Sequence, residues 1–148
     1  MKRNPAVTRR EFLKDSALFI GGAAVTVSGL ACVASYAPVV RVTVADRTIA
    51  VETAIPELMN VGDGIQLASE ELDYPILLIK IAPERFVALS TECMHLGCTV
   101  KKQPSLIRCP CHGSVYDLEG NVLKGPTQHP LMQYAVRMSG TQAIVVAE

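Results

Sequence analysis

Two short segments, Cys93-Met94-His95-Leu96-Gly97-Cys98 and Cys109-Pro110-Cys111-His112-Gly113-Ser114, hold four of the five cysteines and two of the three histidines in the chain. Each segment places one cysteine close to one histidine and carries one further cysteine. A metal centre that bridged the two segments would be offered two thiolates and two imidazoles. The rest of the fold is therefore expected to support these two loops.

The choice of metal is open on residue types alone, because thiolate and neutral imidazole suit both zinc and iron. The spacing argues against zinc. Zinc sites with two cysteines and two histidines usually take like ligands in pairs, whereas each segment here mixes one of each. A centre with two unlike irons explains the mixture, since one iron can take both thiolates and the other both imidazoles.

The pattern C-x-H-x-G-C followed by C-x-C-H-G-S closely resembles the Rieske iron-sulfur proteins. The resemblance implies one 2Fe-2S cluster, with Cys93 and Cys109 on the inner iron and His95 and His112 on the outer, solvent-facing iron. It further implies a disulfide between Cys98 and Cys111, as in the quinol-oxidising branch of the family. A tie of this kind would stiffen two loops that have little secondary structure of their own.

Hydroxyl groups after the second segment are expected to tune the centre. In high-potential members of the family, residues matching Ser114 and Tyr116 direct hydroxyls at cluster sulfurs, which stabilises the reduced state and raises the potential. The same residues could instead cap a turn and pack in the core, and both roles can hold together. Gly125-Pro126 resembles the start of a shielding proline loop, and His129 is expected to be a surface residue rather than a ligand.

The N-terminal segment Thr8-Arg9-Arg10-Glu11-Phe12-Leu13-Lys14 closely resembles a twin-arginine export signal, with an ordinary basic flank of a membrane helix as the alternative. An uncharged stretch, 16–40, follows and could form about 37 Å of helix, enough for a hydrocarbon core of about 30 Å. We expect an uncleaved anchor, although cleavage, or lipidation at Cys32, remains open. The basic residues before it place the N-terminus in the cytoplasm.

The expected organisation is a cytoplasmic segment 1–15, a transmembrane signal anchor 16–40 and one Rieske 2Fe-2S domain 41–148. The last of these holds nine Lys and Arg against twelve Asp and Glu, so no basic surface suggests nucleic acid. Short apolar runs separated by Gly and Pro turns predict an all-β fold, and the resemblance implies an antiparallel sandwich with two cluster-binding loops. The expected strands are 40–44, 48–51, 65–67, 76–81, 86–89, 105–108, 115–117, 122–123, 134–138 and 143–146.

The function implied by the resemblance is electron transfer. The leading hypothesis is the Rieske subunit of a quinol to cytochrome c oxidoreductase in a bacterial cytoplasmic membrane, with a cytochrome b subunit and a c-type cytochrome as partners and quinol binding at the outer iron. An exposed imidazole nitrogen would take the quinol proton. The alternatives are a Rieske subunit of another exported enzyme, such as an arsenite oxidase, and a soluble Rieske ferredoxin. Length leaves no room for a Rieske oxygenase.

Overall fold

The computed structural model describes residues 37–147. The twin-arginine segment, Cys32 and most of the predicted membrane span lie outside these residues. Ala37 is buried in the core and the first strand begins at Val39, so the folded domain includes the last residues of the segment 16–40. Within the described part of the chain, no helix is long and apolar enough to cross a membrane.

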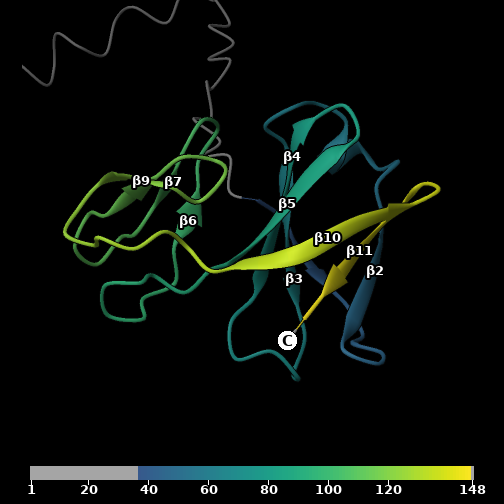
Figure 1. Ribbon diagram of the computed structural model, residues 1–148, viewed down its shortest axis with the longest axis horizontal. Helices are drawn as coiled ribbons and strands as arrows, with labels where there is room; N and C mark the ends of the chain where they lie inside the picture. Colours follow the sequence, from purple (N-terminus) through teal and green to yellow (C-terminus); the bar gives the residue numbers. More distant parts are fainter. Residues whose placement is uncertain (1–36, 148) are drawn as a thin grey trace, which may run out of the picture. The chain divides into compact units, whose positions relative to one another are not determined.

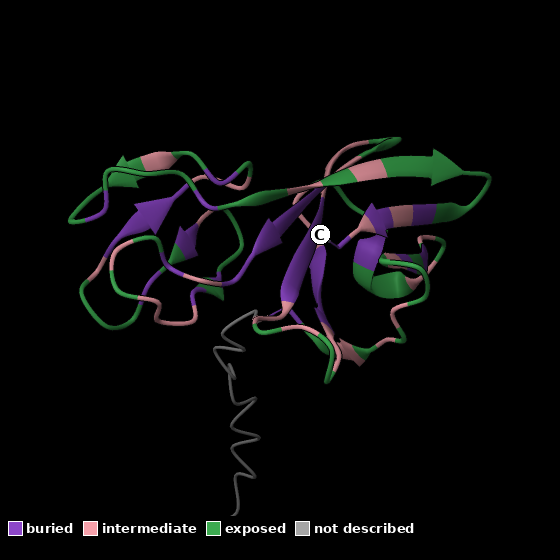
Figure 2. Cartoon of the chain, turned by 60° about the horizontal axis from the view of Figure 1, so that its bottom comes forward, coloured by how far each residue is buried: buried purple, intermediate pink, exposed green. Residues whose placement is uncertain are grey.

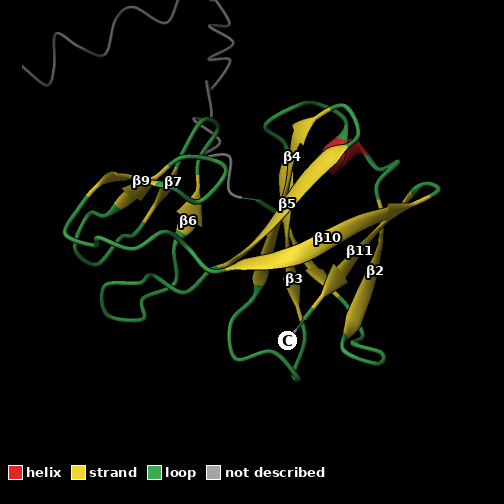
Figure 3. Cartoon of the chain, viewed as in Figure 1, coloured by secondary structure: helices red, strands yellow, loops and turns green. Residues whose placement is uncertain are grey.

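Strands form almost all of the regular structure, which confirms the predicted all-β class (Figure 3). Seven strands make a large sheet in the order β1-β3-β4-β5-β10-β11-β2, and four make a small sheet in the order β6-β7-β8-β9 (Figure 1). The bounds are β1 Val39–Arg41, β2 Thr48–Glu52, β3 Gly64–Ala68, β4 Ile76–Ala82, β5 Arg85–Ser90, β6 Lys101–Lys102, β7 Ile107–Arg108, β8 Val115–Tyr116, β9 Val122–Lys124, β10 Gln133–Ser139 and β11 Gln142–Val146, with one 3-10 helix, η1, at Pro56–Leu58.

Strands β4 and β5 are buried on both faces, and this explains their almost continuous apolar sequence. Successive side chains of a strand point to opposite faces. In β4, Leu77 and Ile79 enter one hydrophobic cluster while Ile76 and Leu78 enter the other. The first cluster joins the large sheet to the small sheet and contains Cys93, Cys109 and Tyr116. The second lies within the large sheet, where β2 and β11 pack toward β3 and β4. Figure 2 shows the buried strands between the exposed outer surfaces.

Three local features differ from the sequence-based expectation. Strand β1 pairs with β3 in parallel, so the large sheet is not wholly antiparallel. The alternating segment 40–44 forms a strand only as far as Arg41, although Val42 and Val44 still pack against the core. Strand β6 was not expected, because Lys101–Lys102 has no apolar residue to indicate a strand.

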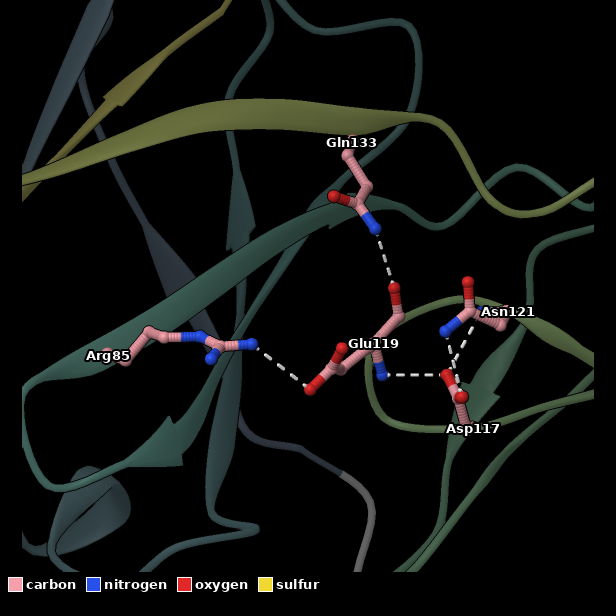
Figure 4. Close-up of polar contacts among 5 residues, drawn as sticks. All are labelled: Arg85, Asp117, Glu119, Asn121 and Gln133. Carbon is pink, nitrogen blue, oxygen red and sulfur yellow. Dashed lines mark hydrogen bonds and ion pairs between the residues drawn. The ribbon is translucent and has the colours of Figure 1, made fainter.

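The turn after β8 fixes the small sheet to the large one (Figure 4). Asp117 Oδ1 accepts hydrogen bonds from the backbone N–H groups of Glu119 and Asn121, both at 2.9 Å. The Glu119 carbonyl then accepts from Gln133 Nε2 of β10 at 2.7 Å, and its carboxylate pairs with Arg85 of β5 at 3.2 Å. The exposed ion pair contributes little stability, whereas the backbone contacts define where the turn sits.

We expect Gly120→Ala to destabilise the domain by roughly 2–4 kcal/mol, from left-handed backbone strain plus overpacking. Gly120 has φ +88°, and a Cβ there would lie 2.9 Å from Leu89 Cδ2 and 3.4 Å from Leu131 Cβ. The midpoint of urea unfolding, followed by circular dichroism, measures the effect. The matched control is Gly140→Ala, which has φ +58° but no atom within 4 Å of the added Cβ. Equal losses in the two variants would mean that packing against Leu89 is unimportant.

Candidate metal centre

The two segments identified in the sequence form loops at the same end of the small sheet. Loop 1, residues 91–100, connects β5 to β6, and loop 2, residues 109–114, connects β7 to β8. Strands β6 and β7 pair with each other, and β7 pairs with β8, so both loops emerge side by side. The short hairpins of this sheet therefore bring together cysteines that are sixteen positions apart, Cys93 and Cys109.

The loops share one backbone frame. In loop 1, Cys93 N donates to the Cys98 carbonyl at 2.9 Å and Gly97 N donates to the Cys93 carbonyl at 2.9 Å. In loop 2, Cys109 N donates to the Ser114 carbonyl at 2.8 Å and Gly113 N donates to the Cys109 carbonyl at 3.2 Å. The fifth residue of each frame is a glycine with positive φ, +74° at Gly97 and +78° at Gly113. The repeat of this frame was not predicted from the sequence.

Cys93 and Cys109 are the two free cysteines in residues 37–147, and both are buried at the end of the first hydrophobic cluster. Burial opposes ionisation of Cys93, but hydrogen bonds from the Tyr116 hydroxyl, the His95 backbone and the Cys109 thiol hold its pKa below the usual value. Burial raises the pKa of Cys109. The hydrogen bonds that favour the thiolate are therefore concentrated on Cys93.

The two predicted histidines lie next to each other. The rings of His95 and His112 meet edge to face, with centroids 4.8 Å apart and an interplanar angle of 86°. His112 is exposed and His95 is half-buried. The Nδ1 atom of His95 is buried without a hydrogen-bond partner, an arrangement that is costly unless this nitrogen has another ligand.

The predicted disulfide is present. Cys98 and Cys111 are bonded, with their Cα atoms 6.5 Å apart, and they link loop 1 to loop 2 across thirteen positions of sequence. The Cys109 sulfur and both disulfide sulfurs lie within 4.8 Å of one another. The disulfide leaves Cys93, Cys109, His95 and His112 as the thiol and imidazole groups of the two loops that remain able to hold a metal centre.

The predicted tuning residues lie next to Cys93. The Tyr116 hydroxyl is 3.4 Å from Cys93 Sγ, and Ser114 and Tyr116 are both fully buried. Burial first, and then the hydrogen bond with Cys93, raise the pKa of Tyr116 to about 12. The hydroxyl therefore keeps its proton at neutral pH and can donate it in a hydrogen bond to the sulfur.

Thr127 is a participant that the sequence analysis missed. It is buried, and its backbone N–H donates to Ser114 Oγ at 3.3 Å. It follows the cis Gly125-Pro126 bond, and its Oγ1 also bonds the backbone of His129. A threonine after Gly-Pro does not by itself indicate a residue of the metal centre, because only the fold brings Thr127 next to Ser114. The His129 side chain is exposed, as predicted.

The donor set fits a centre with two kinds of metal site. Two buried thiols lie inside, while the imidazoles lie toward solvent and one of their nitrogens lacks a protein partner. A single zinc ion could bind the same four groups. It would not explain why the two thiols lie inside while the two imidazoles lie toward solvent.

Comparison with known proteins favours the cluster. The family model for the Rieske 2Fe-2S domain matches residues 53–135. The cytochrome b6-f complex iron-sulfur subunit of Chlorobaculum tepidum is 30% identical over 142 residues, which cover 93% of this chain and 74% of that protein. The corresponding subunit of Chlorobaculum thiosulfatiphilum is 42% identical over 60 residues, 39% of this chain and 33% of the relative.

Solved structures of similar fold include the plasma membrane Rieske protein PetC3 from Synechocystis PCC 6803, with 28% identity and a TM-score of 0.50 over 55% of this chain and 84% of that one. A chain of a hyperthermophilic respiratory Complex III has a TM-score of 0.52 at 22% identity, over 64% of this chain and 71% of that one. The second likeness bears on the fold alone.

Proposed function

Because the chain belongs to the Rieske 2Fe-2S family, we propose that it is the iron-sulfur subunit of a membrane-bound quinol oxidoreductase of the cytochrome b6-f or bc type. In this proposal Cys93 and Cys109 hold the inner iron and His95 and His112 the outer iron. The cluster, when bound, carries one electron at a time. The chain's own residues bind it, exclude water from its sulfur side and present its imidazole side to a substrate.

The observation that carries the proposal is the character of the surface at the imidazoles. His112 is exposed, and so are the neighbouring apolar side chains Leu96, with 69% exposed, and Met94, with 42% exposed. A quinol has an apolar ring with hydroxyl groups. This surface suits it, because apolar contacts can hold the ring while an imidazole nitrogen accepts a hydroxyl proton.

The buried side of the centre supports a high potential. Tyr116, Ser114 and Thr127 are all buried on this side, with the Tyr116 hydroxyl 3.4 Å from Cys93 Sγ and the Thr127 backbone N–H donating to the Ser114 hydroxyl. Hydrogen bonds to sulfur stabilise added negative charge, and a low-solvent pocket strengthens them. Quinol oxidation requires an acceptor at the upper end of the potential range of this family.

We expect Tyr116→Phe to lower the midpoint potential while leaving the cluster assembled. Losing about 1 kcal/mol of differential stabilisation corresponds to roughly 40 mV for a one-electron couple. Protein-film voltammetry of the holoprotein measures the shift. Tyr134→Phe is the matched control, because Tyr134 packs against the other hydrophobic cluster. An unchanged potential in Tyr116→Phe would mean that its hydroxyl does not act on the cluster.

The proposed placement is a single-pass protein of a bacterial cytoplasmic membrane, with 1–15 in the cytoplasm, 16–40 spanning and the clustered domain outside. The alignment that covers 93% of this chain with a b6-f subunit extends over the N-terminal part as well as the domain, which supports this arrangement. The proposed partners are a cytochrome b subunit and a c-type cytochrome or similar carrier.

Purification of the full chain from its native membranes tests this function. A copurifying dihaem cytochrome b would support it. A molybdopterin subunit would instead assign the chain to an exported enzyme of the arsenite-oxidising kind, for which the short ten-residue interval between Cys98 and Cys109 also leaves room. Recovery of the chain only in the soluble fraction would favour a Rieske ferredoxin.

A further inference from the structure

Three exposed cations lie on the strands of the small sheet, at positions next to the two loops. Lys101 of β6 is directly opposite Arg108 of β7, Arg108 is opposite Val115 of β8, and Val115 is opposite Lys124 of β9. Directly opposed residues of antiparallel strands point to the same face. We call Lys101, Arg108 and Lys124 the basic row. The register neighbours of Lys101 and Arg108 on the other face, Lys102 and Ile107, are buried. Val115, between Arg108 and Lys124, is 8% exposed, and the register shifts between β8 and β9, so the pairing gives a shared face for Lys101 and Arg108 and only adjacency for Lys124.

The basic row is unpaired and is unfavourable for folding. All three side chains are exposed, and the one ion pair among the described residues joins Arg85 to Glu119, so no carboxylate neutralises the row. Glu92, which is bridged to Thr99 two residues before Lys101, has its carboxylate beside Gly97. Like charges directly opposite one another destabilise a sheet. The domain as a whole has more acids than bases, which makes this local excess of positive charge distinctive.

The basic row runs along the strand ends that adjoin the metal centre. Lys101 follows loop 1 directly, and Arg108 immediately precedes Cys109 of loop 2. Lys124 immediately precedes Gly125-Pro126, which leads to Thr127 and its hydrogen bond with Ser114. Neighbouring strands of a sheet are about 4.8 Å apart, so a partner that touches the row also comes close to the loops.

We propose that the basic row is a docking surface for an acidic electron-transfer protein, oriented so that the partner's redox centre approaches the flank of loop 2. This inference rests on the proposed electron-transfer function. Charge complementarity selects the occupant: three uncompensated cations on an otherwise acidic domain attract an acidic surface and repel a basic one. The like-charge cost within the sheet is removed when the partner supplies the missing carboxylates.

The first test compares two small oxidants of opposite charge. The reduced full-length holoprotein gives one electron to hexacyanoferrate(III), forming hexacyanoferrate(II), or to the cationic tris(phenanthroline)cobalt(III), forming the cobalt(II) complex. The triple variant Lys101→Gln, Arg108→Gln, Lys124→Gln should lower the ratio of the anionic to the cationic rate constant about tenfold at low salt, and added salt should shrink the effect.

The matched control is the triple variant Arg41→Gln, Arg47→Gln, Arg137→Gln, which removes the same charge from exposed residues outside the small sheet. Arg137 lies in β10 toward its hairpin with β11, on the far side of the domain from β6, β7 and β9 (Figure 1). This control should leave the ratio close to that of the parent. An equal fall in both triple variants would overturn the proposal, because net charge alone would explain it.

The second test measures binding directly. An acidic c-type cytochrome, used as the probe, should bind the parent in detergent with a salt-sensitive affinity that falls about tenfold in the row variant and not in the control. A basic c-type cytochrome should bind the row variant more tightly than it binds the parent. Equal affinity of the parent and the row variant for the acidic probe would overturn the proposal. Failure of the parent to be reduced and reoxidised would refute the proposed electron-transfer function. The binding titration does not depend on redox activity, so it would still test the docking surface.

Two other occupants are distinguished by the same proteins. In proteoliposomes, a difference between parent and row variant that appears with phosphatidylglycerol and vanishes with phosphatidylcholine would assign the row to the membrane surface. Self-association of the parent that the row variant abolishes would assign it to a second copy of the chain. Either result would overturn docking of an acidic redox protein.

Discussion

His95→Ser and Cys109→Ala are each expected to abolish the 2Fe-2S cluster. The proposed ligands are two thiols and two imidazoles, and the remaining cysteines of the two loops are bonded to each other. No free group of the loops can therefore replace the one removed. Iron analysis and the electron paramagnetic resonance spectrum of the reduced variants measure the loss, which should be complete rather than graded.

A matched control for the first variant is His129→Ser, the same chemical change at an exposed histidine outside both loops. Its cluster content and spectrum should equal those of the parent. A mixed-ligand spectrum that survived in His95→Ser would refute the ligand assignment. A parent that binds zinc in place of iron when both are supplied would refute the cluster itself.

The second large effect is expected from the double variant Cys98→Ala, Cys111→Ala. The disulfide closes a loop of thirteen positions, and loss of a crosslink of about this length costs roughly 3 kcal/mol. The four proposed ligands remain, so part of the cluster should assemble. Its midpoint potential should be lower, because less rigid loops hold the sulfurs and their hydrogen-bond donors less closely. Thermal unfolding and voltammetry of the holoprotein measure the two effects.

The parent treated with a reductant that opens the disulfide serves as the control, and it should approach the behaviour of the double variant. A double variant that bound no metal would show that Cys98 or Cys111 is itself a ligand. A double variant as stable as the parent would show that the backbone frames hold the loops without the tie.

The sequence predicted most of what is local in this domain. The apolar segment 76–81 lies within β4, and the hairpin of β10 and β11 lies where alternating residues flank Ser139-Gly140-Thr141-Gln142. The disulfide and the positions of Ser114 and Tyr116 beside Cys93 came from the family resemblance rather than from residue patterns. The motif was specific enough to transfer these positions one by one.

The features that could not be predicted depend on contacts between distant parts of the chain. Lys102 is buried at 5% exposure and belongs to a strand only because Lys101–Lys102 pairs with Ile107–Arg108. The parallel pairing of β1 with β3 joins segments separated by a loop and a second strand. The alternation of polar and apolar residues in a strand does not determine which other strand it pairs with. Such pairings therefore could not be predicted from the residue pattern.

The shared backbone frame of the two loops determines where the chain can change length. Each frame is closed by a hydrogen bond from its first residue to its sixth, so an inserted residue would break the ring and displace a proposed ligand. The connection between β6 and β7 is different: Gln103 N bonds the Leu106 carbonyl across exposed Pro104 and Ser105, at the end of the small sheet away from the loops. Insertions there would lengthen the hairpin without disturbing the centre. Extra residues can thus be added between β6 and β7, by evolution or by design, while the geometry of loops 1 and 2 stays unchanged.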